Sequence, residues 1–383
     1  MVPELSPAEI QRYSRHLMIP DVGMEGQRKL KGASVLIVGT GGLGSPVALY
    51  LAAAGIGRIG LVDYDVVDSS NLQRQVIHGS ANINQLKVES ARRRMVDLNP
   101  YIQVDIYNQV FDSNNAVEIS AGYDLLVDGT DNFPTRYLVN DLSVISKKPY
   151  IYGSIFRFEG QVSVFDAQQG PCYRCLFPEP PPPYLVPSCS QAGVFGVLPG
   201  TIGTLQATEV IKLILGIGEP LIGKLLLYDA LDSSVQTIRL RKNPNCKVCG
   251  PNPQITHLID YDAYCGVPTR DSPENHHTAY DLQPAEVASK IESGEKINIV
   301  DVREPVELQI SSIPGAVNIP VGELAQRLDE LDPDQEYVLV CRTGVRSARA
   351  LGILREAGYA KSYNLQGGIN AWARTVDPKL PEY

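Results

Sequence analysis

One stretch of this chain, residues 33–65, constrains its fold more than any other. It reads ASVLIVGTGGLGSPVALYLAAAGIGRIGLVDYD: an apolar segment, a glycine turn, a helix-forming segment and a second apolar segment that ends in acids. Glycines let the backbone turn tightly and approach a phosphate, and the following helix offers free N–H groups and the positive end of its dipole. The turn contains Gly39, Gly41, Gly42 and Gly44. We therefore expect a strand, turn, helix and strand that together bind a nucleotide.

An acidic residue closes the second expected strand. Asp63 lies 19 residues after Gly44, where a carboxylate can accept a hydrogen bond from a ribose hydroxyl. Glycines in such a turn can also be merely structural, but here the strand, the helix and the acid all occur in the required order. The turn does not identify the nucleotide, so an NAD-dependent oxidoreductase stays open as an alternative.

The overall composition limits the kinds of partner. The chain has 383 residues, which favours two or three domains, and its formal net charge is −9. Nucleic acids and anionic membranes attract basic patches, so an acidic chain points to a protein partner or a small ligand. No apolar run approaches the length of a membrane-spanning helix, and the first residues do not resemble a signal peptide. We expect a cytoplasmic protein that binds neither nucleic acid nor a membrane.

Charged residues follow the expected strands, at the carboxyl edge of the sheet where ligands bind. Arg74 follows the second strand, and Lys87 opens a helix predicted over residues 87–99. A lone lysine on a helix is usually just solvated, but two cations near a phosphate loop suit a triphosphate. Asp128 and Asp131 end a further strand. They can hold Mg²⁺, or Asp131 can instead cap the helix that follows.

The seven cysteines include two C-x-x-C pairs, Cys172 with Cys175 and Cys246 with Cys249, separated by 70 residues. Four thiolates complete a closed tetrahedral zinc site of the structural kind. Two redox dithiols are the alternative, although neither pair begins a helix after a strand as a thioredoxin-like motif does. Cys189 follows a proline-rich loop, EPPPPYLVPS, inside a region whose alternating pattern predicts antiparallel strands added to the parallel core.

A polar segment, residues 251–280, is expected to be a linker between a domain of residues 1–250 and a small α/β domain of residues 281–383. In the second domain Cys341 follows the apolar strand YVLV and opens the loop CRTGVR before a helix. Backbone N–H groups, the helix start and two arginines favour the thiolate, which is the reactive form. Cysteines that end core strands are otherwise commonly buried and unreactive.

Taken together, these motifs resemble two known families. Residues 6–250 resemble the MoeB/ThiF group of adenylating enzymes through RYSRH, GTGGLGSP, DYD, SNLQRQ, Lys87, DGTDNF, the paired C-x-x-C and PSCSQAGV. Residues 281–383 resemble a rhodanese through DVRE, CRTGVR and LQGGINAW. The first resemblance implies a Rossmann-like, mostly parallel sheet extended by antiparallel strands, and the second implies a small α/β rhodanese domain. The fused order resembles enzymes that pair adenylation with sulfur transfer.

The resemblance also implies residue roles. Asp63 would bind the ribose of ATP, Arg74 and Lys87 its phosphates, and Asp131 would help to hold magnesium. Arg15 would reach the site of a partner subunit, which implies a homodimer. Cys189 would form a covalent link to the protein substrate, a ubiquitin-like sulfur carrier, in some relatives but not in others. The implied nucleotide-binding set comprises Gly39, Gly41, Gly42, Gly44, Asp63, Asp65, Ser70, Asn71, Leu72, Gln73, Arg74, Lys87, Asp131, Asn132 and Arg15.

The implied reaction starts from a ubiquitin-like sulfur carrier protein that ends in Gly-Gly. ATP would adenylate its terminal carboxylate, and a persulfide on Cys341, charged by thiosulfate or a cysteine desulfurase, would convert it to a thiocarboxylate. The carrier and its pathway stay open among molybdopterin, thiamine and cysteine synthesis and tRNA thiolation. A non-catalytic scaffold that binds the carrier is the second alternative, after the oxidoreductase.

Overall fold

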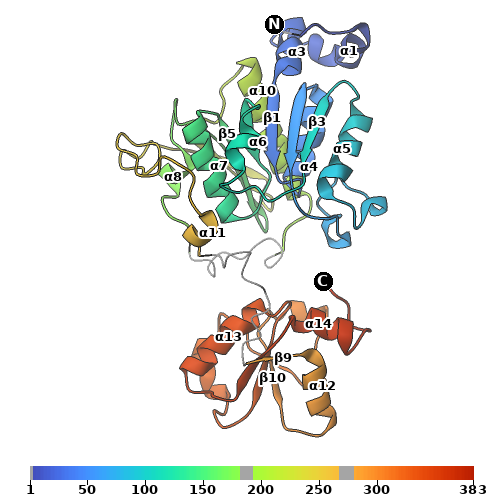
Figure 1. Cartoon of the computed structure of the whole chain (residues 1–383), viewed down its shortest axis with the longest axis vertical. Coiled ribbons are helices and arrows are strands. Elements are labelled where there is room, and N and C mark those ends of the chain that lie inside the picture. Colours follow the sequence, from blue (N-terminus) through green and yellow to red (C-terminus); the bar gives the residue numbers. More distant parts are fainter. Residues whose placement is uncertain (1–2, 182–192, 267–279) are drawn as a thin grey trace. The chain divides into compact units, whose positions relative to one another are not determined.

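The computed structural model describes residues 3–181, 193–266 and 280–383. The chain divides into two compact units, Met1–Thr269 and Arg270–Tyr383, which carry the colours from blue to yellow and from orange to red in Figure 1. Each unit is built on its own sheet. Within the described part of the chain, no helix is long and apolar enough to cross a membrane.

The first unit contains an eight-stranded sheet in the order β3-β2-β1-β4-β5-β6-β7-β8. The first five strands of the chain pair in parallel, and β6, β7 and β8 continue the sheet in antiparallel fashion. This arrangement confirms the expected Rossmann-like sheet with added antiparallel strands. The strands are β1 (Ser34–Val38), β2 (Arg58–Val62), β3 (Gln103–Tyr107), β4 (Leu125–Asp128), β5 (Tyr150–Phe156), β6 (Glu159–Phe165), β7 (Lys224–Asp229) and β8 (Ser234–Arg239).

Helices cover both faces of this sheet because successive residues of the central strands point to opposite sides. Val35 and Ile37 of β1 pack into one apolar cluster with α4, α5 and α10, whereas Leu36 and Val38 pack into another with α6 and α7. The helices of the unit are α1 (Pro7–Arg12), α2 (Ser14–Leu17), α3 (Gly23–Gly32), α4 (Gly44–Ala54), α5 (Lys87–Leu98), α6 (Ala116–Ser120), α7 (Phe133–Ser146), α8 (Tyr173–Leu176), α10 (Leu198–Leu215) and α11 (Tyr261–Tyr264), with short 3-10 turns η1 (Ser69–Asn71) and η2 (Ser80–Asn82).

A buried ion pair ties three of these helices together. Arg174 of α8 donates to both carboxylate oxygens of Asp141 on α7, each at 2.8 Å, and to the hydroxyl of Tyr264 on α11. Tyr261 also donates to Asp141 at 2.9 Å. Both charges are fully buried, so each depends on the other to stay compensated. As a result α11, which lies in the segment expected to be a linker, packs within the first unit.

The second unit is a five-stranded parallel sheet in the order β11-β10-β12-β13-β9. Helix α13 packs on one face, and α12 and α14 pack on the other, which confirms the expected small α/β domain. Its elements are β9 (Asp281–Leu282), α12 (Pro284–Glu292), β10 (Asn298–Asp301), η3 (Glu307–Gln309), β11 (Val317–Asn318), η4 (Leu324–Gln326), η5 (Leu328–Glu330), β12 (Tyr337–Val340), α13 (Val345–Glu356), β13 (Ser362–Leu365) and α14 (Gly368–Thr375).

Two glycines of α10 differ in their surroundings, because Gly203 faces α4 and Gly200 faces open space. A Cβ atom on Gly203 would lie 2.4 Å from a side-chain carbon of Pro46, whereas a Cβ atom on Gly200 would meet nothing within 4 Å. Gly203→Ala should therefore lower the free energy of unfolding by about 1–3 kcal/mol through overpacking. Gly200→Ala should raise it by about 0.5–1 kcal/mol, because alanine favours a helix. Chemical denaturation of both variants measures the difference, and equal effects would contradict the close crossing.

Candidate active sites

The glycine turn lies where β1 ends, and its backbone is packed against the end of β4. Gly39 has a φ of +89°, which favours glycine. A Cβ atom on Gly44 would stand 1.9 Å from the carbonyl oxygen of Gly39, and one on Gly129 would stand 2.4 Å from the same oxygen. Glycine is therefore required at these positions by the close approach of the backbone itself.

The other two glycines of the turn face side chains. A Cβ atom on Gly41 would be 3.5 Å from the Nε2 atom of Gln75. One on Gly42 would be 3.2 Å from the Cβ atom of Pro199 and 3.8 Å from the Cδ atom of Arg74. Arg74 is half-buried, and its guanidinium donates to the backbone carbonyl of Ser70 at 3.1 Å. The Oε1 atom of Gln75 is buried and has no hydrogen-bond partner among the described residues. Arg74 and Gln75 thus border the part of the turn where a phosphate could bind.

Asp63 and Lys87 are both oriented by neighbours. One carboxylate oxygen of Asp63 accepts from the N–H and the hydroxyl of Thr40, at 2.8 and 2.9 Å, and the other accepts from the N–H of Asp65. The Nζ atom of Lys87 lies 2.8 Å from the carboxylate of Asp65. The Lys87 side chain is only 7% exposed, against 48% for Asp65, so the cation is held from a largely buried position. These contacts bring Asp63, Asp65 and Lys87 to the edge of the glycine turn.

The two carboxylates considered for magnesium lie in different environments. Asp128 is fully buried, and its oxygens accept from Thr130 and from the hydroxyl of Tyr150; burial raises its pKa. Asp131 is exposed and forms no hydrogen bond or ion pair with another residue in the described ranges. Asn132, not Asp131, caps α7 by accepting from the N–H of Thr135 at 2.9 Å. Asp131 is therefore left available for a ligand, whereas Asp128 has a structural role.

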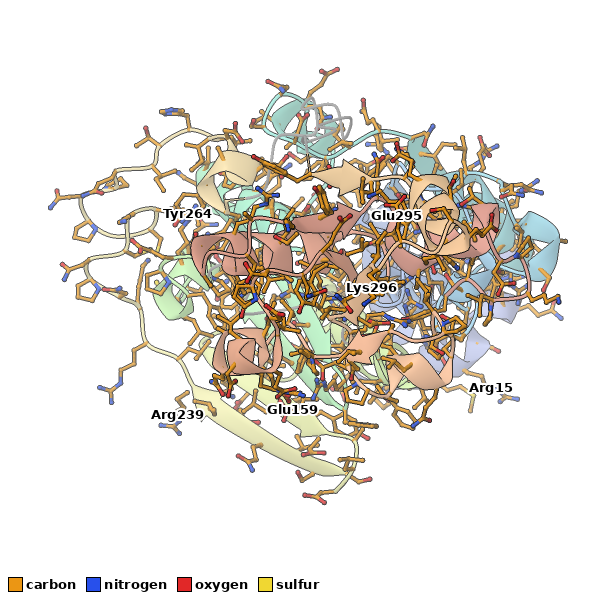
Figure 2. All side chains as sticks on the ribbon, turned by 90° about the horizontal axis from the view of Figure 1, so that it is seen from below. Arg15, Glu159, Arg239, Tyr264, Glu295 and Lys296 are labelled. Atoms are coloured by element: carbon orange, nitrogen blue, oxygen red, sulfur yellow. The ribbon has the colours of Figure 1, made fainter. Side chains whose placement is uncertain are left out.

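The segment after β2 forms the rim of this site. Ser70 donates to Asp68 through both its N–H and its hydroxyl, and Asn71 accepts from the N–H of Asp68. Leu72 follows in the same turn, and Gln73 lies against Gly196, where a Cβ atom would be 2.2 Å from its Oε1 atom. Arg15 extends outward from α2 (Figure 2), with its guanidinium 3.9 Å from the sulfur of Met18. Cys189 lies outside the described residues.

The four paired cysteines converge as the sequence predicts. The sulfur atoms of Cys172, Cys175, Cys246 and Cys249 all lie within 4.8 Å of one another. Three of the sulfur–sulfur distances are 3.4, 3.6 and 3.9 Å. A tetrahedral zinc with Zn–S bonds of about 2.3 Å places its sulfurs roughly 3.8 Å apart. The cluster therefore fits a zinc ion, and it joins the segment at α8 to the segment after β8.

The second site is the loop after β12. The Sγ atom of Cys341 accepts from the N–H of Gly344 at 3.2 Å and from the hydroxyl of Ser347 at 3.3 Å. The sulfur therefore lies beside the start of α13, with a backbone N–H and a hydroxyl directed at it. Cys341 is only 1% exposed, however. A bulky acceptor can therefore reach the sulfur only if the residues around it move.

Two pairs of charged residues lie close to this loop. Arg346 donates to both oxygens of Glu307, at 2.6 and 2.7 Å, and Arg303 pairs with both oxygens of Asp301. The hydroxyl of Tyr383 accepts from Arg303 at 2.7 Å and donates to Glu307 at 2.9 Å. No local motif marks Glu307 or Tyr383, because the contacts span 39 residues from Glu307 to Arg346 and 76 from Glu307 to Tyr383.

Comparisons with known proteins now identify both halves. The family model described as ThiF family matches residues 13–248, and the Rhodanese-like domain model matches residues 283–375. The chain belongs to the ThiF family. Its first half is thus a ThiF domain with the glycine turn and the Asp63–Lys87 region at its carboxyl edge, and its second half is a rhodanese-like domain with Cys341 in its loop.

Relatives of this ThiF protein share both halves. The probable adenylyltransferase/sulfurtransferase MoeZ of Mycobacterium tuberculosis is 50% identical over 99% of this chain and 96% of its own length. The adenylyltransferase and sulfurtransferase MOCS3 of Drosophila yakuba is 42% identical over 99% and 86%. A crystal structure of E. coli MccB with ATP matches 64% of this chain and 75% of its own with 26% identity and a TM-score of 0.56. The chain is therefore an enzyme of the adenylyltransferase/sulfurtransferase kind, which sets aside the oxidoreductase and the scaffold.

His78 is a further residue of the first site that the sequence did not reveal. It is buried, and its Nδ1 atom lies 2.9 Å from the hydroxyl of Ser90. Burial, and to a smaller extent the nearby charge of Lys87, lower the pKa of His78 to about 4. A histidine on a short turn carries no local sign of such burial. The folded protein thus holds His78 neutral at a pH where an unfolded chain would bind a proton.

This shift predicts a pH dependence of stability. Because the pKa of His78 is lower in the folded state, its contribution to the free energy of unfolding is complete above about pH 6.5. This contribution is lost as the pH falls toward 4. Between pH 7.5 and 5 the free energy of unfolding of the wild type should fall by about 2 kcal/mol more than that of His78→Gln. Denaturant titrations at both pH values test this, with the exposed His257→Gln as control. Parallel losses in wild type and His78→Gln would contradict it.

Proposed function

We propose that this enzyme adenylates the C-terminal Gly-Gly carboxylate of a ubiquitin-like sulfur carrier protein and then replaces the adenylate with sulfur from Cys341. The observation that carries the proposal is the presence, in one chain, of a phosphate-binding glycine turn bordered by cations and a cysteine whose sulfur accepts two hydrogen bonds in a rhodanese-type loop. The MoeZ and MOCS3 relatives are named for the same pair of activities.

In the first step, a carboxylate oxygen of the carrier attacks the α-phosphorus of ATP, and pyrophosphate leaves. Free N–H groups at Gly41 and Gly42 suit the phosphates, and Arg74 and Lys87 offset the charge that develops on the phosphoryl oxygens. Asp63 would accept from the ribose. The remaining proposed contacts of the nucleotide are made by Gly39, Gly44, Asp65, Ser70, Asn71, Leu72, Gln73, Asp131 and Asn132.

Magnesium fits the exposed carboxylate of Asp131, since hard oxygen ligands suit this ion and no other described residue engages that side chain. A bound Mg²⁺ would neutralise phosphate charge. Arg15 is proposed to act in the site of a second copy, which makes the enzyme a homodimer. Its exposed position and its weak contact with Met18 leave the guanidinium able to do so.

In the second step, the terminal sulfur of a Cys341 persulfide attacks the acyl carbon, and AMP leaves. A thiolate of a dithiol reductant then attacks the Sγ atom of Cys341, the S–S bond breaks, the thiocarboxylate leaves with the electron pair, and the second thiol of the reductant reduces the disulfide that has formed. Cys189 is the candidate for a separate covalent link to the carrier. The persulfide would be supplied by a cysteine desulfurase or by thiosulfate. A cytoplasmic location suits this chemistry, because its thiols must stay reduced.

The two activities should separate by mutation. Lys87→Ala should lower carrier-dependent ATP–pyrophosphate exchange by about 10²–10³-fold, because it removes a buried cation from the phosphate site. Cys341→Ala should abolish sulfur transfer from thiosulfate and leave the exchange intact. Arg94→Ala, on the exposed side of the same helix as Lys87, serves as the control. Exchange that persists in Lys87→Ala, or that needs no Gly-Gly carboxylate, would refute the proposal.

The zinc proposal makes a separate prediction. Protein purified without chelators should contain one zinc per chain, and Cys246→Ser should release it and lower the melting temperature of the first unit, because three thiolates remain around a buried gap. Cys265→Ser, which changes a buried thiol outside the cluster, is the matched control. Elemental analysis together with thermal denaturation measures both effects. Zinc-free protein of unchanged stability would show that the cluster is not a metal site.

A further inference from the structure

The rhodanese-type loop carries an arginine whose charge is already cancelled from within the chain. Arg346 lies between Gly344 and Ser347, the two residues that donate to the sulfur of Cys341. Both of its terminal nitrogens bond to the carboxylate of Glu307. The two side chains are only 19% and 12% exposed, so water screens this pair weakly. Such a two-bond pair is the strongest form of arginine–carboxylate contact.

Glu307 is itself held in place from three sides. It accepts from the backbone N–H of Glu304 at 3.0 Å and from the hydroxyl of Tyr383 at 2.9 Å, besides Arg346. Burial alone would raise the pKa of Glu307, but these bonds outweigh it and lower the pKa. The carboxylate is therefore charged at neutral pH. Tyr383 is fixed in turn by Arg303 and by backbone contacts with Asn370.

We propose that Glu307 is a positioning residue that sets donor specificity: by cancelling the charge of Arg346 it disfavours small dianionic sulfur donors such as thiosulfate. The persulfide on Cys341 would then come chiefly from a donor that presents sulfur on a protein thiol. This inference rests on the sulfurtransferase half of the proposed function.

The chemistry explains why the pairing matters. The Cys341 thiolate attacks the outer sulfur of thiosulfate, the S–S bond of thiosulfate breaks, and sulfite leaves with the electron pair. Both the attacking and the leaving groups are anions. A dianion that approaches a thiolate is repelled unless a cation lies near its sulfonate oxygens. Arg346 has the planar donors that such oxygens need, but Glu307 occupies them.

A neutral residue at position 307 should release this cation. In Glu307→Gln, the full-length enzyme should show a KM for thiosulfate that is lower by roughly tenfold, about the effect of one charge-assisted hydrogen bond. Its kcat for transfer to cyanide should stay near that of the wild type, because Cys341 and its two donors are untouched. The lower KM should also depend more steeply on salt concentration.

Two further variants separate this effect from a change in structure. The double variant Glu307→Gln/Arg346→Gln should lose the gain in KM, since the released cation is gone. Glu323→Gln breaks an exposed pair with Arg327 in the same unit and should leave the KM unchanged. A merely structural role for Glu307 would change kcat or stability and would not depend on Arg346.

The outcomes are distinguishable. An unchanged or higher KM in Glu307→Gln, with active wild type, overturns the inference on Glu307 and leaves the proposed function standing. Persistence of the lower KM in the double variant also overturns it. If the wild type transfers sulfur no faster than Cys341→Ser from either thiosulfate or a persulfide on a cysteine desulfurase, the sulfurtransferase half of the proposed function is itself wrong.

Discussion

The rest of the first unit depends on the close approach of three backbone segments at the glycine turn. The carbonyl oxygen of Gly39 lies where a Cβ atom on either Gly44 or Gly129 would collide with it, so the end of β1, the start of α4 and the end of β4 meet without side chains between them. This contact fixes where α4 begins. It also leaves Gly41 and Gly42 at the surface of the turn, beside Arg74 and Gln75, which is the condition for a phosphate to reach the backbone.

The polar residues around this turn are pre-organised by one another. Thr40 and the N–H of Asp65 hold the carboxylate of Asp63, and Asp65 in turn holds Lys87. Such contacts reduce the side-chain entropy lost when a ligand is bound. The same principle orders the second unit, where Gly344 and Ser347 hold the sulfur of Cys341 at the end of a parallel strand. Both sites thus use the carboxyl edge of a parallel sheet, although the two sheets are unrelated in strand order.

Features that depend on residues close together in the sequence could be predicted, whereas features that depend on residues far apart could not. The glycine turn and the loop of Cys341 both depend on residues a few positions apart, and the structure has them as expected. Asn132 rather than Asp131 caps α7, a choice between neighbours that composition cannot make. Gln75, His78, Glu307 and Tyr383 have no local signature, since burial and long-range contacts define them.

The two sites treat their cations differently, and this difference fits the charge of what each must hold. In the first unit, Arg74 bonds to a backbone carbonyl, and Lys87 bonds to a carboxylate that is about half exposed, so neither positive charge is fully cancelled. A polyanion can therefore compete for both. In the second unit, Arg303 bonds to the buried carboxylate of Asp301 and Arg346 to the partly buried carboxylate of Glu307, each through two or more bonds. The persulfide proposed on Cys341 would carry a single charge, which the backbone N–H of Gly344, the hydroxyl of Ser347 and the start of α13 could offset. Unpaired positive charge beside Cys341 would instead attract competing anions. The pairing of Arg303 and Arg346 with carboxylates removes this attraction.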